Sequence, residues 1–402
     1  MDNGNTSNWK EFTQGNTQEE APKRIQKKPK RKKKVLWLIL ATVAVLGIVA
    51  LVLLWDQSNF DGLRRKIIYA TAKKDESGCA ELYQYAGDPS SRFATLDGTL
   101  VNLSANQLEM ISEKGKTFVN ESIRFHTPTL VSREICAAAY DTGGTSLYVL
   151  GSKGILWKLE NEEEIRCVTI NENNYVTVVS NKSGYKASVC VYDDKGEPFY
   201  EFNSADRFVM TAALSKDNRT LAAVTMGQDS GRFVSYLLLY RTNSKDLLKK
   251  LPISNGMVYD MGWVDGCFCV VAEDGVYFVE TDGTQVGSYA FENLYLRRCS
   301  MSGNGYVSLL VSRYKSGSQC MLLAIDPEGD ELGCCEIDSE VLGFDSAGRY
   351  TAVLCADQLM IFDKAMEEVS RLGDISEAHQ VLMRADGSAV LSGTSAARLY
   401  LP

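Results

Sequence analysis

The longest apolar stretch of the chain is residues 35–55, VLWLILATVAVLGIVALVLLW, which contain no charge and no proline. As a helix rising ~1.5 Å per residue, such a stretch spans about 30 Å, the thickness of a bilayer's hydrocarbon core. The apolar region of a signal peptide is only about 7–15 residues long and ends in a small-x-small cleavage site, which residues 56–59 lack. The pattern therefore predicts one uncleaved transmembrane helix over residues 35–55.

The periodicity changes after this stretch. Residues 60–74 predict a short amphipathic helix, with one side apolar and the other basic: Leu63, Ile67 and Ile68 against Arg64, Arg65 and Lys66. We assign residues 56–78 to a stalk or linker that contains this helix. From residue 79 onward, short β-rich runs alternate with Gly, Asp, Asn and Ser turns, and no long 3.6-residue period appears. This texture predicts an all-β domain over residues 79–402.

Internal repetition specifies the architecture of that domain. An apolar strand followed by an Asp- or Gly-based turn recurs about every 35–48 residues, which is the length of one four-stranded propeller blade. Seven copies are visible, at residues 108–115, 155–159, 189–196, 237–241, 276–283, 322–329 and 359–364. Residues 380–383, 389–392 and 397–401 supply three further strands without a fourth. Because residues 79–85 form a strand without a sheet, we expect the two ends to share an eighth blade; seven blades are the alternative.

Charge predicts the topology. Residues 1–34 carry ten Lys/Arg and four acidic residues, whereas residues 56–402 carry 33 and 47. Basic flanks stay cytoplasmic, so we expect a disordered cytoplasmic tail, a single-pass anchor in the cell membrane and an extracellular propeller. The Lys/Arg cluster next to residue 35 is expected to contact lipid head groups together with residues 35–55. The acidic outer part argues against a nucleic-acid partner.

Candidate chemistry is sparse. The eleven cysteines lie mostly within or beside apolar strands, with no C-x-x-C pair, and so predict reduced core residues rather than a disulfide framework or a zinc site. Cys267 and Cys269 should share one strand face. The only histidines, His126 and His379, precede strands and suit turn positions better than catalysis. Phosphate-binding loops and calcium loops are missing, and the acidic residues lie mostly in turns. We therefore predict no catalytic, cofactor-binding or metal-binding residue.

Several short segments recur in a fixed order in one known family: residues 127–130, 140–144, 181–185 with 191–193, 213–215 and 395–397. Together with the basic tail and the apolar stretch, they make the chain resemble an uncharacterised bacterial family, domain of unknown function 5711. The resemblance implies a membrane-anchored propeller outside the cell, and it implies no reaction, ligand or site residue. The hairpin at residues 214–222 also resembles a common propeller repeat, with Asn218 in place of glycine.

Three function classes are compatible with these features. The favoured one is a non-enzymatic binding or scaffold module at the bacterial cell surface, whose propeller face binds a protein or an envelope glycan. The alternatives are an extracytoplasmic hydrolase acting on glycans or lactones, which would need convergent acidic residues at one channel mouth, and a ligand sensor. The scarcity of histidine and the lack of metal-ligand spacing favour the binding module.

Overall fold

The computed structural model describes residues 37–47, 61–85, 88, 90–133, 135–229, 231–375 and 377–402. The chain divides into two units, residues 1–60 and residues 61–402. Residues 37–47 are helical and fall inside the predicted membrane span, while the rest of that span and the basic tail lie outside the described residues. Over the described ranges, no helix combines the length and the apolar character needed to cross a membrane.

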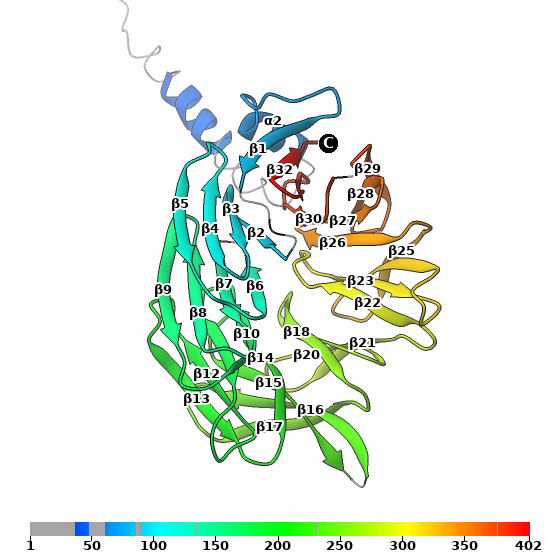
Figure 1. Cartoon of the computed structure of the whole chain (residues 1–402). Coiled ribbons are helices and arrows are strands. Elements are labelled where there is room, and N and C mark those ends of the chain that lie inside the picture. The colour runs from blue at the N-terminus through cyan, green and yellow to red at the C-terminus, as the bar shows by residue number, and fades with distance from the viewer. Residues whose placement is uncertain are drawn as a thin grey trace, which may run out of the picture. The chain divides into compact units, whose positions relative to one another are not determined.

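The second unit is a ring of eight four-stranded antiparallel sheets (Figure 1). We number the blades in chain order and write each from its innermost strand outward. Blade 1 is β2 (Arg92–Leu96), β3 (Thr99–Leu103), β4 (Gln107–Ser112) and β5 (Thr117–Ser122); blade 2 is β6 (Pro128–Arg133), β7 (Cys136–Asp141), β8 (Ser146–Gly151) and β9 (Gly154–Glu160). Blade 3 is β10 (Ile165–Ile170), β11 (Val176–Ser180), β12 (Ala187–Tyr192) and β13 (Pro198–Ser204); blade 4 is β14 (Phe208–Leu214), β15 (Thr220–Asp229), β16 (Arg232–Arg241) and β17 (Leu247–Ser254).

The second half of the ring follows the same order. Blade 5 is β18 (Val258–Val264), β19 (Cys267–Ala272), β20 (Gly275–Val279) and β21 (Gln285–Ala290); blade 6 is β22 (Tyr295–Ser300), β23 (Val307–Ser312), β24 (Cys320–Ile325) and β25 (Glu331–Ile337). Blade 7 is β26 (Val341–Ala347), β27 (Tyr350–Cys355), β28 (Gln358–Asp363) and β29 (Glu368–Gly373). Blade 8 is β30 (Gln380–Met383), β31 (Ala389–Ser392), β32 (Ala396–Tyr400) and, from the start of the domain, β1 (Cys79–Gln84).

Blade 8 closes the ring by joining the two ends of the domain. β1 pairs antiparallel with β32, from Cys79 opposite Tyr400 to Gln84 opposite Ala396. The hydroxyl of Tyr85, just after β1, donates to the carbonyl oxygens of Gly393 and Ala396 at 2.8 and 2.9 Å. The eight-blade prediction and the predicted closure are thus confirmed, and the seven-blade alternative is wrong.

The repeated turns explain why this sequence forms hairpins. Gly196, Gly283 and Gly329 have φ near +85°, a region that strains residues with a Cβ, and each occupies a turn between the third and fourth strands of its blade. Asn218 takes the same left-handed conformation at φ 61°, as its place in the predicted β14–β15 hairpin requires. These turns end each strand after about six residues and so fix the height of the blades.

The apolar core lies between the faces of neighbouring blades. One cluster joins Cys267, Cys269 and Phe278 of blade 5 to Leu309 and Leu323 of blade 6. The predicted shared face of Cys267 and Cys269 is therefore confirmed. All eleven cysteines lie in the described part of the chain and are free; five are buried, five are half-buried and Cys334 is exposed.

The helix that precedes the propeller is α2 (Asp61–Ile68), shorter than the predicted 60–74. It ends early because Tyr69 is buried in the propeller core and the chain then turns, with the Ala72 N–H donating to the Tyr69 carbonyl. The Asp75 carboxylate accepts from the N–H groups of Ser77 and Cys79 and leads the chain into β1. α2 therefore groups with the propeller in one compact unit.

Candidate functional site

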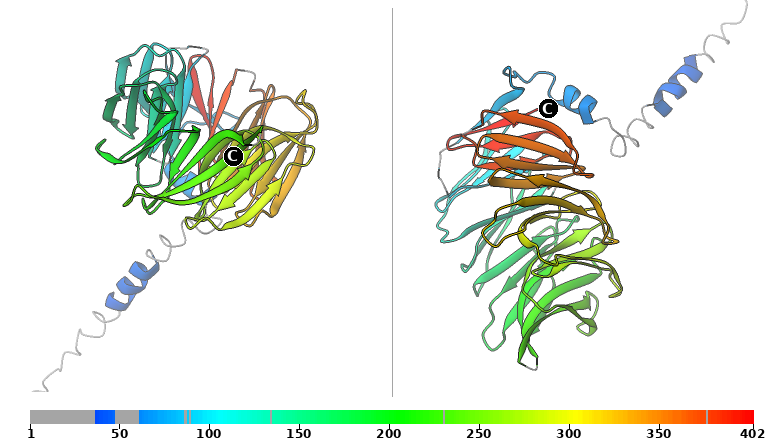
Figure 2. Two further views of the ribbon diagram at one scale, coloured as in Figure 1. Left: turned by 90° about the horizontal axis from the view of Figure 1, so that it is seen from below. Right: turned by 90° about the vertical axis from the view of Figure 1, so that its right-hand side faces the viewer.

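The two faces of the ring carry different chain segments. The connections between blades and the turns between second and third strands lie on one face, which we call the connector face. The turns between first and second strands lie on the other, together with α2. There the Arg65 guanidinium donates to the carbonyl oxygen of Asp386, in the β30–β31 turn, at 2.8 Å. We call this second face the α2 face; the right panel of Figure 2 shows α2 at the edge of the propeller.

Three consecutive blades begin with an exposed aromatic side chain at the connector face. Phe208 opens β14, Tyr259 is the second residue of β18, and Tyr295 opens β22, with exposed fractions of 56, 52 and 38%. Large hydrophobic side chains are usually buried, so exposed ones near the starts of three neighbouring inner strands form a feature that the fold itself does not need. Three further exposed residues lie on the same face of these blades: Phe233, Met257 and Tyr314.

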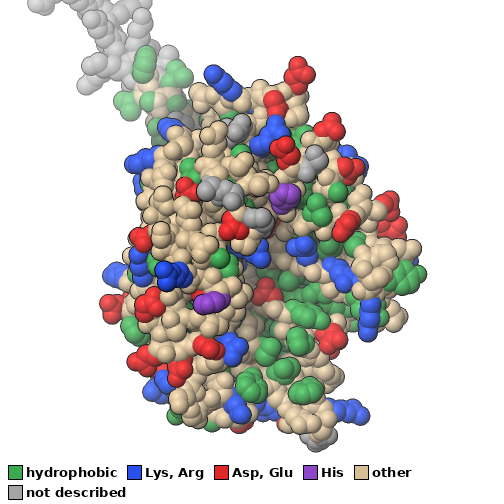
Figure 3. Space-filling model, viewed as in Figure 1, with side chains coloured by type: hydrophobic (Ala, Val, Ile, Leu, Met, Phe, Trp, Pro, Cys, Tyr) green, Lys and Arg blue, Asp and Glu red, His purple; other side chains and the backbone are tan. Residues whose placement is uncertain are grey.

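We call these six residues the aromatic rim: Phe208, Phe233, Met257, Tyr259, Tyr295 and Tyr314. In Figure 3 the centre of this view is hollowed, and hydrophobic side chains gather beside the hollow over blades 5 and 6. Cations flank the rim. The Lys186 ammonium lies 5.2 Å from the ring centroid of Phe208, and that of Lys315 lies 5.7 Å from the ring centroid of Tyr295. The rim thus offers apolar surface bordered by positive charge.

A long hairpin supports one end of the rim. β15 and β16 have ten residues each, more than the other strands of the ring, and place Phe233 near their tip. Arg207 fixes this hairpin: its guanidinium donates to the Asp229 carboxylate at 2.7 Å and lies 4.5 Å from the ring centroid of Tyr236. Gly227 leaves room for Arg207, because a Cβ there would lie only 2.7 Å from the guanidinium nitrogen. The neighbouring Phe208 is held at the base of the same hairpin, paired with Met226.

The other end of the rim is fixed by Arg297 on β22. Its guanidinium donates to the Ser312 hydroxyl and to the carbonyl oxygens of Tyr314 and Lys315, at 2.8, 2.8 and 2.6 Å. These bonds hold the β23–β24 turn, which carries Tyr314, close to the start of β22. The backbone that carries the rim residues is therefore already ordered. Because less of it has to be ordered on binding, a partner would bind at a smaller cost in entropy.

Two acidic side chains on inner strands have unusual surroundings. Burial raises the pKa of Asp345 on β26 to about 7, although its carboxylate accepts from the N–H groups of Met383 and Ser346 at 2.8 and 2.9 Å. Asp260 on β18 keeps solvent-exposed surface, yet desolvation raises the pKa of its carboxyl, against the opposing hydrogen bond from the Met261 N–H. Both carboxyls can thus hold a proton at a higher pH than an ordinary aspartate.

Cysteines accompany Asp260 in the middle of the ring. Burial and, to a smaller extent, the charge of Asp260 together raise the pKa of Cys167 on β10 to about 11, against an opposing hydrogen bond to Thr211. The same two causes raise the pKa of Cys299 on β22 to about 12. Because a thiolate is the reactive form of cysteine, these thiols are poor nucleophiles at neutral pH. The Asp260 carboxyl is thus close enough to Cys167 of blade 3 and Cys299 of blade 6 to affect both thiols.

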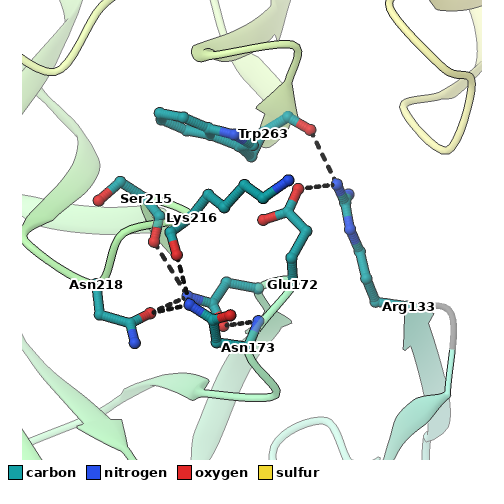
Figure 4. A network of polar contacts seen from close by, with 8 residues as sticks. Arg133, Glu172, Asn173, Ser215, Lys216, Asn218 and Trp263 are labelled. Atoms are coloured by element: carbon teal, nitrogen blue, oxygen red, sulfur yellow. Dashed lines mark hydrogen bonds and ion pairs between the residues drawn. The ribbon is translucent and has the colours of Figure 1, made fainter. Parts of the chain in front are cut away.

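A polar network crosses the ring at the α2 face (Figure 4). Arg133, at the end of β6 in blade 2, donates to Glu172 of blade 3 at 2.5 Å and to the Trp263 carbonyl of blade 5 at 3.2 Å. The Lys216 side chain extends toward the Glu172 carboxylate in the same view. One salt-bridged arginine therefore links blades 2, 3 and 5 across this mouth of the channel.

Asparagines hold the two loops that carry Glu172 and Lys216. Asn171 donates to the Ser215 carbonyl at 3.0 Å and to the side-chain oxygen of Asn218 at 2.6 Å, while Asn173 donates to the Lys216 carbonyl at 2.5 Å. The polar groups of this network thus form most of their hydrogen bonds with one another. The exception is the second carboxylate oxygen of Glu172, which is buried without a hydrogen-bond partner. We assign it a structural role in bracing blades 2–5.

The two histidines lie on the connector face in separate blade connections. The His126 side chain is 95% exposed, and its Nδ1 lies 3.5 Å from the Asp141 carboxylate. The backbone N–H of His126 donates to that same carboxylate. His379 lies between blades 7 and 8, where Nε2 is 3.4 Å from the Thr394 hydroxyl. It lines a pocket of about 620 Å³ with Asp374, Glu377 and Arg398. Both histidines therefore lie in connections between strands.

No metal centre is evident in the described ranges, because they contain no group of three or more His, Cys, Asp or Glu side chains that could hold an ion. The sequence analysis named no site residue, and it missed the aromatic rim. A signal was available: in residues 208–210, 258–260 and 295–297, an aromatic residue stands at or next to the start of an inner strand. Recognising it required knowing which strand of each blade is innermost.

The sequence matches a family model over residues 78–370, from β1 into β29. The chain belongs to DUF5711, a family of unknown function. The predicted resemblance is thereby confirmed, and membership of DUF5711 assigns no activity. No curated protein sequence matches this DUF5711 chain.

Solved structures with the same fold include proteins with quite different descriptions. The C-terminal WD40 domain of Sif2 has 12% identity and a TM-score of 0.58, covering 81% of this chain and 98% of that one. BamB from Moraxella catarrhalis has 14% identity and a TM-score of 0.51, with coverage of 80% and 99%. The dihydro-heme d1 dehydrogenase NirN, in complex with DHE, has 13% identity and a TM-score of 0.50, with coverage of 80% and 75%. At such identities the similarity shows the fold alone.

Proposed function

We propose that this DUF5711 chain is a membrane-anchored, non-enzymatic binding protein whose aromatic rim binds a protein partner outside the cell. The observation that carries the proposal is the rim itself, three exposed aromatic residues near the starts of adjacent inner strands with further hydrophobic residues beside them. Tyr, Phe, Met and Arg are the residue types enriched at the cores of protein interfaces. The anchor is residues 35–55, with residues 1–34 in the cytoplasm, as charge and hydropathy predict.

Protein is favoured over glycan as the partner by the lysines at the rim. A glycan ring stacks on a free aromatic face, but Lys186 lies over the ring of Phe208 and Lys315 over that of Tyr295. A protein partner can place apolar side chains on the rim and carboxylates next to the lysines, so that both kinds of group on the rim are complemented.

Co-purification from membranes tests this proposal. The full-length chain and a variant with Phe208→Ser, Tyr259→Ser and Tyr295→Ser are crosslinked in cells, purified and compared by mass spectrometry. We expect the triple variant to lose the bound protein at least about tenfold, because interface aromatics carry a large share of binding energy. The matched control is Leu156→Ser, Val286→Ser and Val369→Ser, three residues on outer strands with exposed fractions of 54, 40 and 54%. Equal recovery with the rim variant and the control would contradict the proposal.

A second candidate, hydrolysis of glycans or lactones, is favoured by the raised pKa values of Asp260 and Asp345 on inner strands. It predicts turnover that Asp260→Asn or Asp345→Asn abolishes. The binding proposal predicts no turnover across a panel of glycans, lactones, esters and peptides, and the same purified protein serves for both measurements.

A further inference from the structure

α2 presents an apolar strip that the propeller does not cover. Leu63, Ile67 and Ile68 have exposed fractions of 46, 58 and 51%. Leu63 and Ile67 are four residues apart and share one side of the helix, and Ile68 extends the apolar surface about 100° further round the axis. The opposite side of the helix is occupied: Arg65 donates to the Asp386 carbonyl, and Tyr69, in the next turn, is buried. The helix is therefore docked to blade 8 in an orientation that leaves its apolar side outward.

The docking of α2 is rigid. The Arg384 guanidinium donates to the Tyr69 hydroxyl at 2.6 Å, to the Tyr83 hydroxyl of β1 at 3.0 Å and to Glu113 of the β4–β5 turn at 3.0 Å. One side chain of the β30–β31 turn thus joins β1, blade 1 and Tyr69, the residue directly after α2. Gly387, in that turn at φ +82°, leaves the space that the Arg65 guanidinium occupies. The apolar strip consequently has a fixed direction relative to the α2 face.

Chain length places this strip close to the bilayer. Only residues 56–60 separate the predicted span from Asp61, and a fully extended chain covers at most ~3.6 Å per residue, so α2 begins within about 22 Å of the point where the span ends. Exposed basic residues are near the strip in the sequence, namely Lys66 on the helix and Lys73 and Lys74 after it. Glu76 is exposed nearby, whereas Asp75 is engaged by Arg398 at 2.8 Å.

We infer that α2 lies in the membrane–water interface, with Leu63, Ile67 and Ile68 among the lipids and Lys66, Lys73 and Lys74 at anionic head groups. An apolar strip flanked by lysines is the composition of an interfacial helix. Three half-exposed aliphatic side chains cover much less than the ~800 Å² that each partner of a stable protein complex buries, so lipid is favoured over protein as the occupant. The propeller then rests on its α2 face and points the aromatic rim away from the membrane.

This inference depends on the proposed anchor, and photocrosslinking in nanodiscs separates the two. The full-length chain, reconstituted in phosphatidylglycerol and phosphatidylcholine, carries p-benzoylphenylalanine in place of Leu63, Ile67, Trp55 or Phe233 in four separate variants. Each variant must keep the thermal unfolding midpoint of the unsubstituted chain. Lipid adducts at positions 63 and 67, at least about tenfold above those at position 233, are the expected result.

The other possible crosslinking results distinguish the anchor from the interfacial helix. Adducts at position 55 without adducts at 63 and 67 overturn the interfacial helix and leave the anchor standing. Absence of lipid adducts at position 55 overturns the anchor and, with it, the inference. Crosslinks from 63 and 67 to a second protein chain would show that α2 contacts protein, and the interfacial helix would be wrong.

Discussion

At the residue scale, Asp345 shows how the ring uses a carboxylate that is only partly exposed. The side chain bridges two inner strands, since its oxygens accept from the N–H of Ser346 in blade 7 and from that of Met383 in blade 8. Burial nevertheless outweighs these bonds and raises the pKa to about 7. The protonated form is therefore favoured more strongly in the folded chain than in the unfolded one, where an aspartate has a pKa near 3.9.

Asp345 consequently makes stability depend on pH. A folded-state pKa above the unfolded one stabilises the fold fully at low pH, and this contribution is lost as pH rises from about 4 through 7. This lost stabilisation amounts to at most about 1.4 kcal/mol per pH unit. Asp345→Asn removes the titrating group, so the urea unfolding midpoint of the variant should change less between pH 4 and 7 than that of the unsubstituted chain. Asp282→Asn should act in the opposite direction, because the Thr284 N–H lowers the pKa of Asp282. Parallel profiles for all three chains would contradict this account.

At the element scale, much of the fold could be predicted because each blade repeats a local rule. Apolar strands that end in Asp-Gly turns are visible without the structure, and the unpaired strand at each end implied their union in blade 8. α2 was predicted only in part. Its apolar residues were identified, but the docking of Arg65 on the Asp386 carbonyl joins positions 321 residues apart in sequence. The rim was missed for a similar reason, since its residues gather only when blades 4–6 are side by side.

β1 offers the sharpest test of the closure. Deleting residues 79–86 should unpair the outer edge of blade 8 and remove Tyr83 and Tyr85 from the core, lowering the free energy of unfolding by several kcal/mol. Chemical denaturation followed by tryptophan fluorescence measures the loss. The control deletes residues 1–60, which leaves α2 and β1 intact and should cost less than about 1 kcal/mol. Equal stability of the two chains would show that blade 8 does not depend on β1.

At the scale of the whole molecule, the ring shields its thiols. Ten of the eleven cysteines are buried or half-buried, and only Cys334, on the outer strand β25, is exposed. Its pKa is raised chiefly by the hydrogen bond to Glu331, so even this thiol is mostly protonated at neutral pH. The chain therefore keeps its cysteines unreactive through packing, without pairing them.

Alkylation of the native protein should report this shielding. Iodoacetamide without denaturant should modify Cys334 first, faster at pH 9 than at pH 7, and the other ten only after unfolding in urea. Mass spectrometry of the intact protein and its peptides counts the modified sites. Cys334→Ser is the control and should leave almost no native labelling. Several disulfide-linked peptides in protein purified without reductant would contradict the free-thiol state.

The union of β1 with β32 also has a consequence for biosynthesis. At about 5–20 residues per second, the 321 residues that separate Arg65 from its partner Asp386 take roughly 15 to 65 s to synthesise. During that time the N-terminal segment exists as an unfinished edge, and the growing arc exposes the apolar flanks of blades 1 and 7 that blade 8 will cover. The ring can close only when its last residues have emerged, so a chain shortened at its C-terminus stays an open arc. Loss of β32 would therefore leave β1 without its partner strand.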